Sequence, residues 1–140
     1  MFQRILVAYD GSEGAHRALD VATELARTGE ADVIALGVEA HLPHYAATVG
    51  EVEEERRFEE QQERRLLAEA AAYAAEKGLT IRQEIRAGHA AQTIVDVAKE
   101  KSVDLIVVGH SGHSGVLGHF LGGTAEKVSR HAPCSVLIVR

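Results

Sequence analysis

Residues 5–12 read ILVAYDGS, an apolar run that stops abruptly at turn-forming residues. The run from Ile5 to Ala8 has the pattern of a buried β-strand. Asp10, Gly11 and Ser12 then supply the chemistry of a tight turn and a helix N-cap. Since an apolar helical pattern follows directly, this stretch predicts the first strand and first crossover of an α/β fold.

The rest of the chain repeats this alternation. Apolar residues at three- and four-residue spacing predict helices over residues 15–29, 51–77 and 94–98, and a short one through Ala125 and Val128 that ends before Pro133. Strands are expected over 32–38, 79–86, 103–108 and 135–139. Residues 41–50 have no period and are expected to form a loop of about ten residues. The order predicts an open five-stranded parallel sheet with helices on both faces.

The composition limits the function classes. The 140 residues fit a single domain, 1–140, and no apolar run approaches the ~20 residues that cross a bilayer. No signal-peptide pattern precedes Ile5, and Cys134 is the only cysteine, so a cytoplasmic protein is expected. A net charge of -6 argues against nucleic acid as a partner. An anionic ligand would need local backbone donors and helix ends.

Such donors are expected in residues 109–124, GHSGHSGVLGHFLGGT, which contain six glycines. In a 3-2-1-4-5 strand order, Asp10 and Gly109 emerge at the same edge of the sheet, where ligands bind in open α/β sheets. Gly109 and Gly112 allow successive N–H groups to converge on an anion. Residues 122–124 would begin a helix, whose free N–H groups favour phosphate.

Simpler readings stand beside this one. Glycine-rich loops also form mobile turns, and neither G-x-x-x-x-G-K-[ST] nor G-x-G-x-x-G is present. Asp10 is equally well explained as a residue that caps or turns the chain into the first helix. The charged first half of helix 51–77 is read as a solvated face, and Cys134 as a small buried residue at a strand start.

The loop histidines also have two readings. His110, His113 and His119 could ligate a metal, but they have no cysteine or carboxylate partner nearby in sequence, which favours solvated or phosphate-facing side chains. If His113 lies over the phosphates, its protonation near a pKa of about 6.5 would strengthen binding at mildly acidic pH.

The spacing Gly109-x-x-Gly112, nine residues, then Gly122, followed by residues 124–128 (TAEKV) and 131–134 (HAPC), resembles the universal stress protein family. Residues 5–12 also resemble that family's opening, so the resemblance covers essentially the whole chain. It implies a 3-2-1-4-5 sheet, a cytoplasmic homodimer joined partly through the last strand, and a role in stress endurance. In the subgroup with G-x-x-G-x9-G-[ST] it also implies ATP binding.

The resemblance carries roles over by position. Asp10 would contact the ribose, Ala8 and Val38 would line the adenosine pocket, and Val108 and Gly109 would continue it. The phosphates would be held by Gly112, Gly122, Gly123 and Thr124, with His113 nearby. The family's Ser or Thr after the last glycine is Gly123 here, a change expected to weaken binding by about 0.5–1.5 kcal/mol, one net hydrogen bond.

The leading hypothesis is therefore an ATP-binding regulatory protein of the stress response, with or without Mg²⁺, in which no residue is assigned a catalytic or metal-binding role. A slow ATPase is the weaker alternative, because no general base, Walker-type lysine or paired metal carboxylates are evident. The other alternative is a nucleotide-free dimerisation module, against which the glycine spacing argues.

Overall fold

The computed structural model describes residues 1–40, 48–111 and 121–140. Five strands and four helices alternate through these residues. Their bounds are β1 Arg4–Ala8, α1 Glu13–Gly29, β2 Asp32–Glu39, α2 Val49–Glu76, β3 Arg82–Ala87, α3 Ala90–Glu100, β4 Leu105–Gly109, α4 Gly123–His131 and β5 Ser135–Val139.

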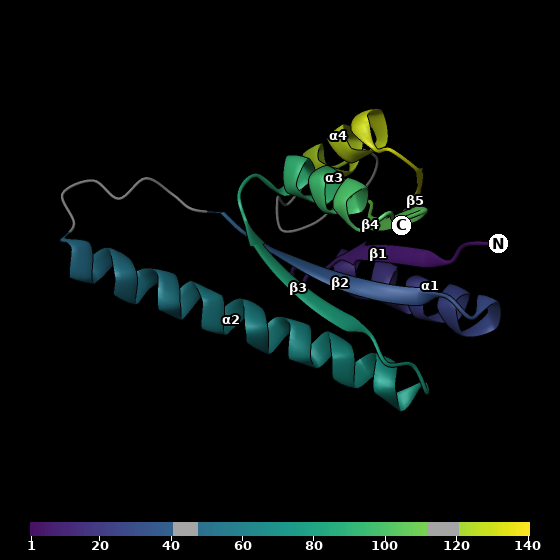
Figure 1. Ribbon diagram of the computed structural model, residues 1–140, viewed down its shortest axis with the longest axis horizontal. Helices are drawn as coiled ribbons and strands as arrows, with labels where there is room; N and C mark the ends of the chain where they lie inside the picture. Colours follow the sequence, from purple (N-terminus) through teal and green to yellow (C-terminus); the bar gives the residue numbers. More distant parts are fainter. Residues whose placement is uncertain (41–47, 112–120) are drawn as a thin grey trace.

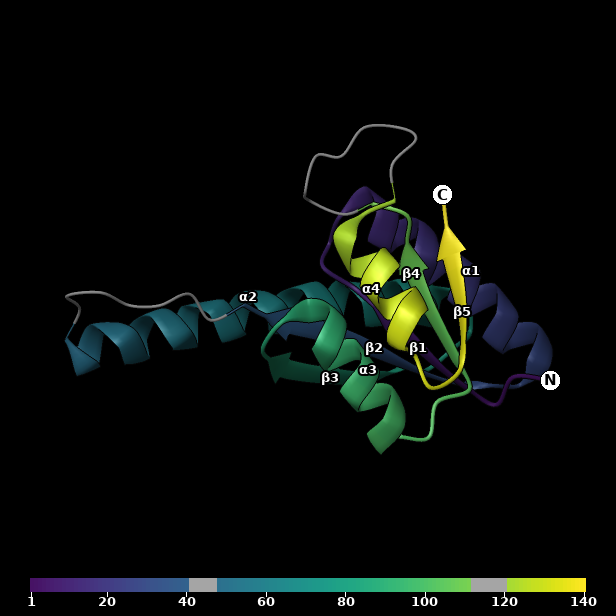
Figure 2. The same cartoon turned by 90° about the horizontal axis from the view of Figure 1, so that it is seen from above.

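The five strands form one parallel sheet in the order β3-β2-β1-β4-β5, which confirms the predicted fold. β1 lies at the centre, where Val7 pairs with Ala35 of β2 on one side and with Val107 of β4 on the other. Figures 1 and 2 show α3 and α4 on one face of this sheet and α1 and α2 on the other.

β1 shows why both faces of the sheet need helices. Ile5 and Val7 pack with α1 and α2, while Leu6 packs with α3 and α4, and all three side chains are 0% exposed. Leu105 and Ile106 of β4 divide between the two faces in the same way. The unbroken apolar runs in the sequence therefore mark strands covered on both sides.

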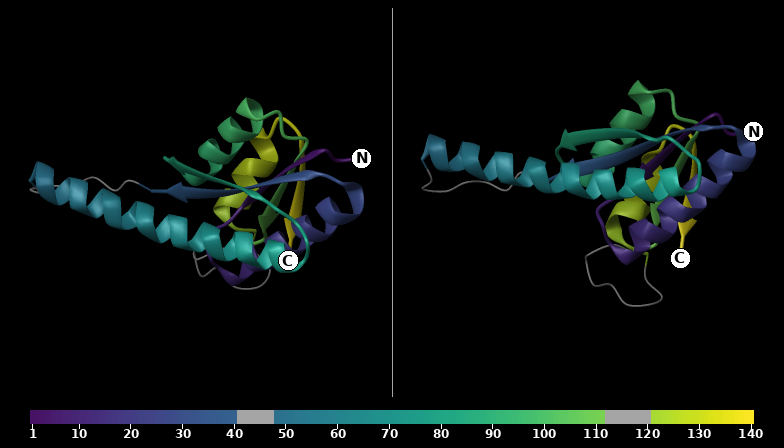
Figure 3. Two further views of the ribbon diagram at one scale, coloured as in Figure 1. Left: turned by 60° about the horizontal axis from the view of Figure 1, so that its bottom comes forward. Right: turned by 90° about the horizontal axis from the view of Figure 1, so that it is seen from below.

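α2 begins two residues earlier than predicted. Thr48 accepts a hydrogen bond from the Glu51 N–H at 3.2 Å and donates its own N–H to the Glu51 carboxylate at 3.3 Å, a capping box that the sequence analysis overlooked. The expected loop over 41–50 therefore ends at Thr48, and residues 41–47 lie outside the described part. The helix continues for 28 residues, and its first half extends beyond the sheet (Figure 3).

β3 begins three residues later than predicted, because the end of α2 holds the chain. Gly78 takes a φ of 83°, and the Leu79 N–H donates to the Ala74 carbonyl at 2.9 Å. Leu79 and Ile81 therefore pack against the core as part of the helix exit rather than as strand residues.

Two other boundaries also moved. α3 starts at Ala90, four residues before the apolar cluster at Ile94 that predicted it. β4 starts after Asp104, whose carboxylate accepts hydrogen bonds from the Gln3 and Arg4 N–H groups at 2.8 and 3.0 Å. This side chain ties the start of β1 to the start of β4.

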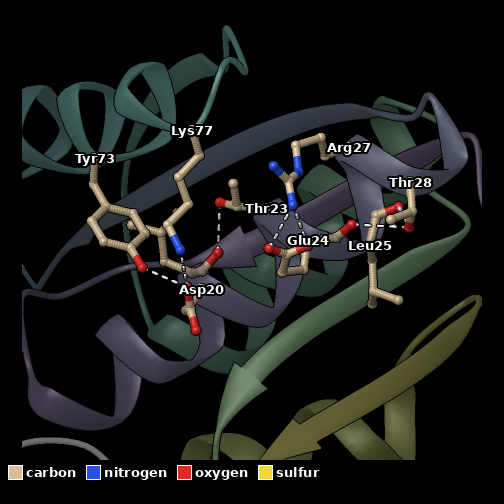
Figure 4. A network of polar contacts seen from close by, with 9 residues as sticks. Asp20, Thr23, Glu24, Leu25, Arg27, Thr28, Tyr73 and Lys77 are labelled. Carbon is tan, nitrogen blue, oxygen red and sulfur yellow. Dashed lines mark hydrogen bonds and ion pairs between the residues drawn. The ribbon is translucent and has the colours of Figure 1, made fainter.

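A polar network joins α1 to α2 on their shared face (Figure 4). The Tyr73 hydroxyl donates to an Asp20 carboxylate oxygen at 2.5 Å, and the Lys77 ammonium donates to the same oxygen at 3.0 Å. These two donors lower the pKa of Asp20, with the Tyr73 hydrogen bond as the larger cause. In the ranges that the structure describes, no helix is long and apolar enough to cross a bilayer.

Tyr73→Phe is expected to lower the free energy of unfolding by about 0.5–1 kcal/mol at neutral pH, since the lost hydrogen bond is partly solvent-screened. Because the pKa of Asp20 is lower in the folded state, its stabilisation is present above the unfolded value of about 3.9 and is lost as the pH falls through the folded value. Urea unfolding at about pH 7 and about pH 3 should therefore show the difference between the two proteins shrinking in acid. An equal difference at both pH values would contradict this role for Asp20.

Candidate functional site

The main cleft of the described chain opens at the carboxyl edge of β1 and β4. These strands pair in parallel at the centre of the sheet, so the segments that follow them leave side by side. The cleft has a volume of about 980 Å³, in the range of small-molecule sites. It lies among the ends of β1, β2 and β4 and the helices α3 and α4.

Most of the residues predicted from sequence meet in this cleft. Eight of the ten line it, namely Ala8, Asp10, Val38, Val108, Gly109, Gly122, Gly123 and Thr124. The other two, Gly112 and His113, lie outside the described residues, as do His41, His44 and His119. Residues about a hundred positions apart in the chain, such as Ala8 and Val108, thus line the same cleft.

The apolar floor of the cleft comes from the face of the sheet that α3 and α4 cover. Ala8, Leu36, Val38 and Val108 line it from three adjacent strands, and Ile94 of α3 closes one side. Such a surface suits the flat apolar face of an aromatic ring system.

The turn after β1 is held by side chains. The Ser12 N–H donates to the Asp10 carboxylate at 2.9 Å, and the Ser12 hydroxyl accepts from the Ala15 N–H at 3.2 Å. Gly11 takes a φ of 79°, a conformation that favours glycine. The capping reading of this turn is therefore confirmed, with Asp10 as the turn residue and Ser12 as the N-cap. Asp10 remains exposed at the edge of the cleft, within reach of a ligand.

The segment after β4 is fixed by backbone hydrogen bonds. The His110 N–H donates to the Val139 carbonyl at 2.7 Å, and the His110 carbonyl accepts from the Gly122 N–H at 2.8 Å. The two ends of the glycine-rich stretch are thereby joined. Gly122 is the N-cap of α4, so the helix begins at the mouth of the cleft.

Two helices present their N-termini to the cleft without a side-chain cap. Among the described residues, neither His89 at the start of α3 nor Gly122 at the start of α4 supplies a cap hydrogen bond, whereas Ser12 and Thr48 cap α1 and α2. The first-turn N–H groups of α4, with the positive end of the helix dipole, are donors suited to an anion.

Carboxylates also gather behind the cleft, on the face of the sheet that α2 covers. Burial raises the pKa of Glu63 in α2, and the nearby Glu39 and Asp10 carboxylates raise it further. Among the described residues, Asp10 and Glu126 are the acidic residues that line the cleft itself, and Lys127 and Arg130 are basic residues of its lining. An anion would be repelled beside Asp10, whereas the first-turn N–H groups of α4 can donate hydrogen bonds to it.

Tyr9 follows the last residue of β1 and is buried beside the cleft. Its side chain is 2% exposed, and its hydroxyl lies 2.9 Å from Nε2 of His16, with the two rings edge to face. Burial raises the pKa of Tyr9, and the Glu69 and Asp10 carboxylates add to the effect. The phenol therefore stays neutral at physiological pH.

The start of α3 was missed from sequence. Residues 89–92 line the cleft, but the helix was recognised only by its buried residues from Ile94 onward. Gly88, with a φ of 144°, marks the turn before it and is the signal that could have placed this N-terminus.

Lys127, Arg130 and His131 extend the lining along α4. Cys134, predicted to be a small buried residue at a strand start, lies just before β5 and is half-buried. Its partial burial raises the pKa of its thiol. Within the described ranges, no group of three or more His, Cys, Asp or Glu side chains is placed to hold a metal ion.

Comparisons with known proteins agree with the fold and with the family that the sequence resembles. The model of the universal stress protein family matches residues 1–140. The universal stress protein YxiE of Bacillus subtilis is 38% identical over 148 residues, with both chains fully covered.

Solved structures give the same answer. The universal stress protein UspA from Lactobacillus plantarum superposes with a TM-score of 0.89 at 29% identity, over 99% of this chain and 98% of its own. A universal stress protein solved in complex with cAMP matches with a TM-score of 0.77 at 28% identity, over 99% of this chain and 97% of its own. On the family model, the full-length relatives and the shared five-stranded fold, this chain belongs to the universal stress protein family.

Proposed function

We propose that this protein is a nucleotide-binding regulator of the stress response that holds an adenine nucleotide, ATP in particular, in the cleft at the carboxyl edge of β1 and β4. The observation that carries the proposal is the combination of an apolar floor with an uncapped helix N-terminus at its rim. An adenine nucleotide has this same division between a flat base and an anionic tail. The similar protein solved with cAMP supports the adenine nucleotide class.

The apolar floor, Asp10 and the uncapped start of α4 set the orientation of the ligand. The base lies on the floor of Ala8, Val38 and Val108. The Asp10 carboxylate accepts a hydrogen bond from a ribose hydroxyl, a role open to a carboxylate but unfavourable beside phosphate. The phosphates then lie at the first turn of α4, with backbone donors from Gly123 and Thr124, because the Gly122 N–H already donates to the His110 carbonyl. Mg²⁺, if bound, would be held mainly by the phosphates.

Titration calorimetry with ATP, ADP, AMP and cAMP, with and without Mg²⁺, tests the proposal, together with mass spectrometry of any molecule that co-purifies. Saturable binding of at least one adenine nucleotide is expected, with ATP tightest because it presents the most negative charge to α4. Assay of released phosphate in the same samples separates binding from hydrolysis. No binding of any adenine nucleotide would contradict the proposed function.

Gly123 offers a sharper test of where the phosphates lie. A Cβ at Gly123 would meet no heavy atom within 4 Å, so a side chain fits there without rearrangement. Gly123→Ser adds a hydroxyl beside the proposed phosphates, and Gly123→Ala adds the same carbon without it. The Ser variant is expected to bind ATP about two- to tenfold more tightly than the Ala variant, the worth of one hydrogen bond. Equal affinities would mean that the phosphates do not reach this turn.

We also propose a cytoplasmic homodimer formed through β5. β5 is an edge strand with the sequence SVLIV, and Leu137 is 36% exposed, whereas the opposite edge, β3, has the charged and polar sequence RQEIRA. Charged residues discourage pairing at a sheet edge, and apolar ones permit it.

Leu137→Lys is expected to shift the protein from dimer to monomer, because it places a charge in the buried part of the proposed interface. Gln83→Lys is the matched control, since it places the same side chain on the exposed strand β3 at the other edge. Sedimentation velocity or light scattering reads out the mass. A monomeric wild type, or a dimer that survives Leu137→Lys, would rule out this interface.

A further inference from the structure

Three glycines from distant parts of the sequence meet at the base of the phosphate side of the cleft. Gly14 lies in the first turn of α1, Gly109 ends β4, and Gly122 precedes α4. A Cβ at Gly109 would lie 2.8 Å from the carbonyl carbon and oxygen of Gly14, and one at Gly122 would lie 3.1 Å from the His110 carbonyl oxygen. These three residues bring backbone directly against backbone.

The tightest approach is at Gly14. A Cβ there would lie 2.3 Å from the carbonyl oxygen of Ser111, well inside the 3.0 Å below which real Cβ contacts are essentially absent. This distance is about 0.7 Å shorter than real Cβ contacts allow, and the atom in the way belongs to the backbone, which cannot rotate away as a flexible side chain would.

The requirement at Gly14 is for space and not for an unusual backbone. The glycines with positive φ in the described ranges are Gly11, Gly78 and Gly88, so Gly14 has a conformation open to any residue. Glycine within a helix is less favourable than alanine. Gly14 is also buried, so its small size is used in packing rather than at a solvent-exposed turn.

The contact fixes the path of the chain toward the proposed phosphates. From Gly109 the backbone passes over Gly14 to Ser111, while His110 is hydrogen-bonded to Val139 on one side and to Gly122 on the other. Displacement of Ser111 would therefore pull on the hydrogen bond that orients Gly122, the N-cap of α4. Binding sites lose affinity when donors move by this much, because hydrogen bonds need both distance and direction.

We infer that Gly14 is a positioning residue for the nucleotide site: by admitting the Ser111 carbonyl against the first turn of α1, it sets the placement of the phosphate-binding turn at Gly122. Its relevance to ligand binding rests on the function proposed above. Gly14 itself does not need to touch the ligand.

The test compares Gly14→Ala with Gly29→Ala. Both variants make the same change in the same helix, but a Cβ at Gly29 would meet no heavy atom within 4 Å. The first measurement is amide hydrogen exchange in the ligand-free proteins. The His110 and Gly122 amides are both hydrogen-bonded, and in Gly14→Ala they are expected to exchange at least about tenfold faster than in the wild type. The amides that pair β1 with β2 are expected to exchange at the wild-type rate in this variant. In Gly29→Ala, all of these amides are expected to exchange at the wild-type rate.

The second measurement is ATP affinity by calorimetry at a temperature where both variants are folded. Gly14→Ala is expected to raise the Kd at least about tenfold, as expected for the loss of a hydrogen bond to a charged group, and Gly29→Ala to change it less than twofold. A Kd unchanged in Gly14→Ala overturns the inference, whether or not exchange accelerates. If the wild type binds no adenine nucleotide, the proposed function fails, and the exchange comparison alone decides whether Gly14 positions the turn.

If Gly14→Ala folds poorly, Gly122→Ala takes its place. This variant probes the same packing of Gly14, Gly109 and Gly122 from the other side, and more mildly, because its Cβ would lie 3.1 Å from the His110 carbonyl oxygen. Faster exchange of the Gly122 amide together with weaker ATP binding would support the packing of these three glycines as the element that positions the turn. If Gly122→Ala changes neither the exchange of the Gly122 amide nor the affinity for ATP, the inference is overturned.

Discussion

The parallel pairing of β1 with β4 at the centre of the sheet is the constraint on which the rest of the structure depends. Because Leu6 pairs with Ile106 and Val7 with Val107, the chain must cross back from the edge strand β3 to the far side of β1, and both faces of these central strands become buried. Each crossover helix then starts at the same edge. The cleft, its apolar floor and the helix N-termini at its rim all follow from this one pairing.

An acidic protein needs a local device to hold an anion. The net charge is -6, and Asp10 places a carboxylate at one end of the cleft. The proposed phosphate site lies at the other end, where α4 starts at Gly123 without a side-chain cap from the described residues. Backbone N–H groups can donate hydrogen bonds to an anion without any positively charged side chain. Glycine lets several such groups approach one another. The same separation of charge would orient a nucleotide in one direction.

Apolar runs such as Leu105 to Val108 allowed the covered strands to be predicted, and the resemblance to the family implied their 3-2-1-4-5 order. Eight of the ten predicted site residues line the cleft. Boundaries were less accurate where local hydrogen bonds decide them. Thr48 starts α2 through a capping box, and Gly78 delays β3 by holding Leu79 to the helix end. Periodicity in the sequence does not report such bonds.

The site was predicted unevenly for a similar reason. Asp10 stood out through turn chemistry and Gly122 through its place at a predicted helix start, but Gly14 was not singled out, because its close contact with Ser111 exists only in three dimensions. Residues 89–92 were missed because the apolar residues of α3 begin later. Side chains could be predicted where local chemistry required them, and not where only packing did.

The most direct test of the central claim is to map bound ATP by amide chemical shifts in the wild-type protein. The amides of Gly122, Gly123 and Thr124 at the start of α4 are predicted to shift most, together with those at the ends of β1 and β4, because the phosphates and base lie there. Saturable binding whose largest shifts fall instead on α2 and β3, away from this cleft, would contradict the account.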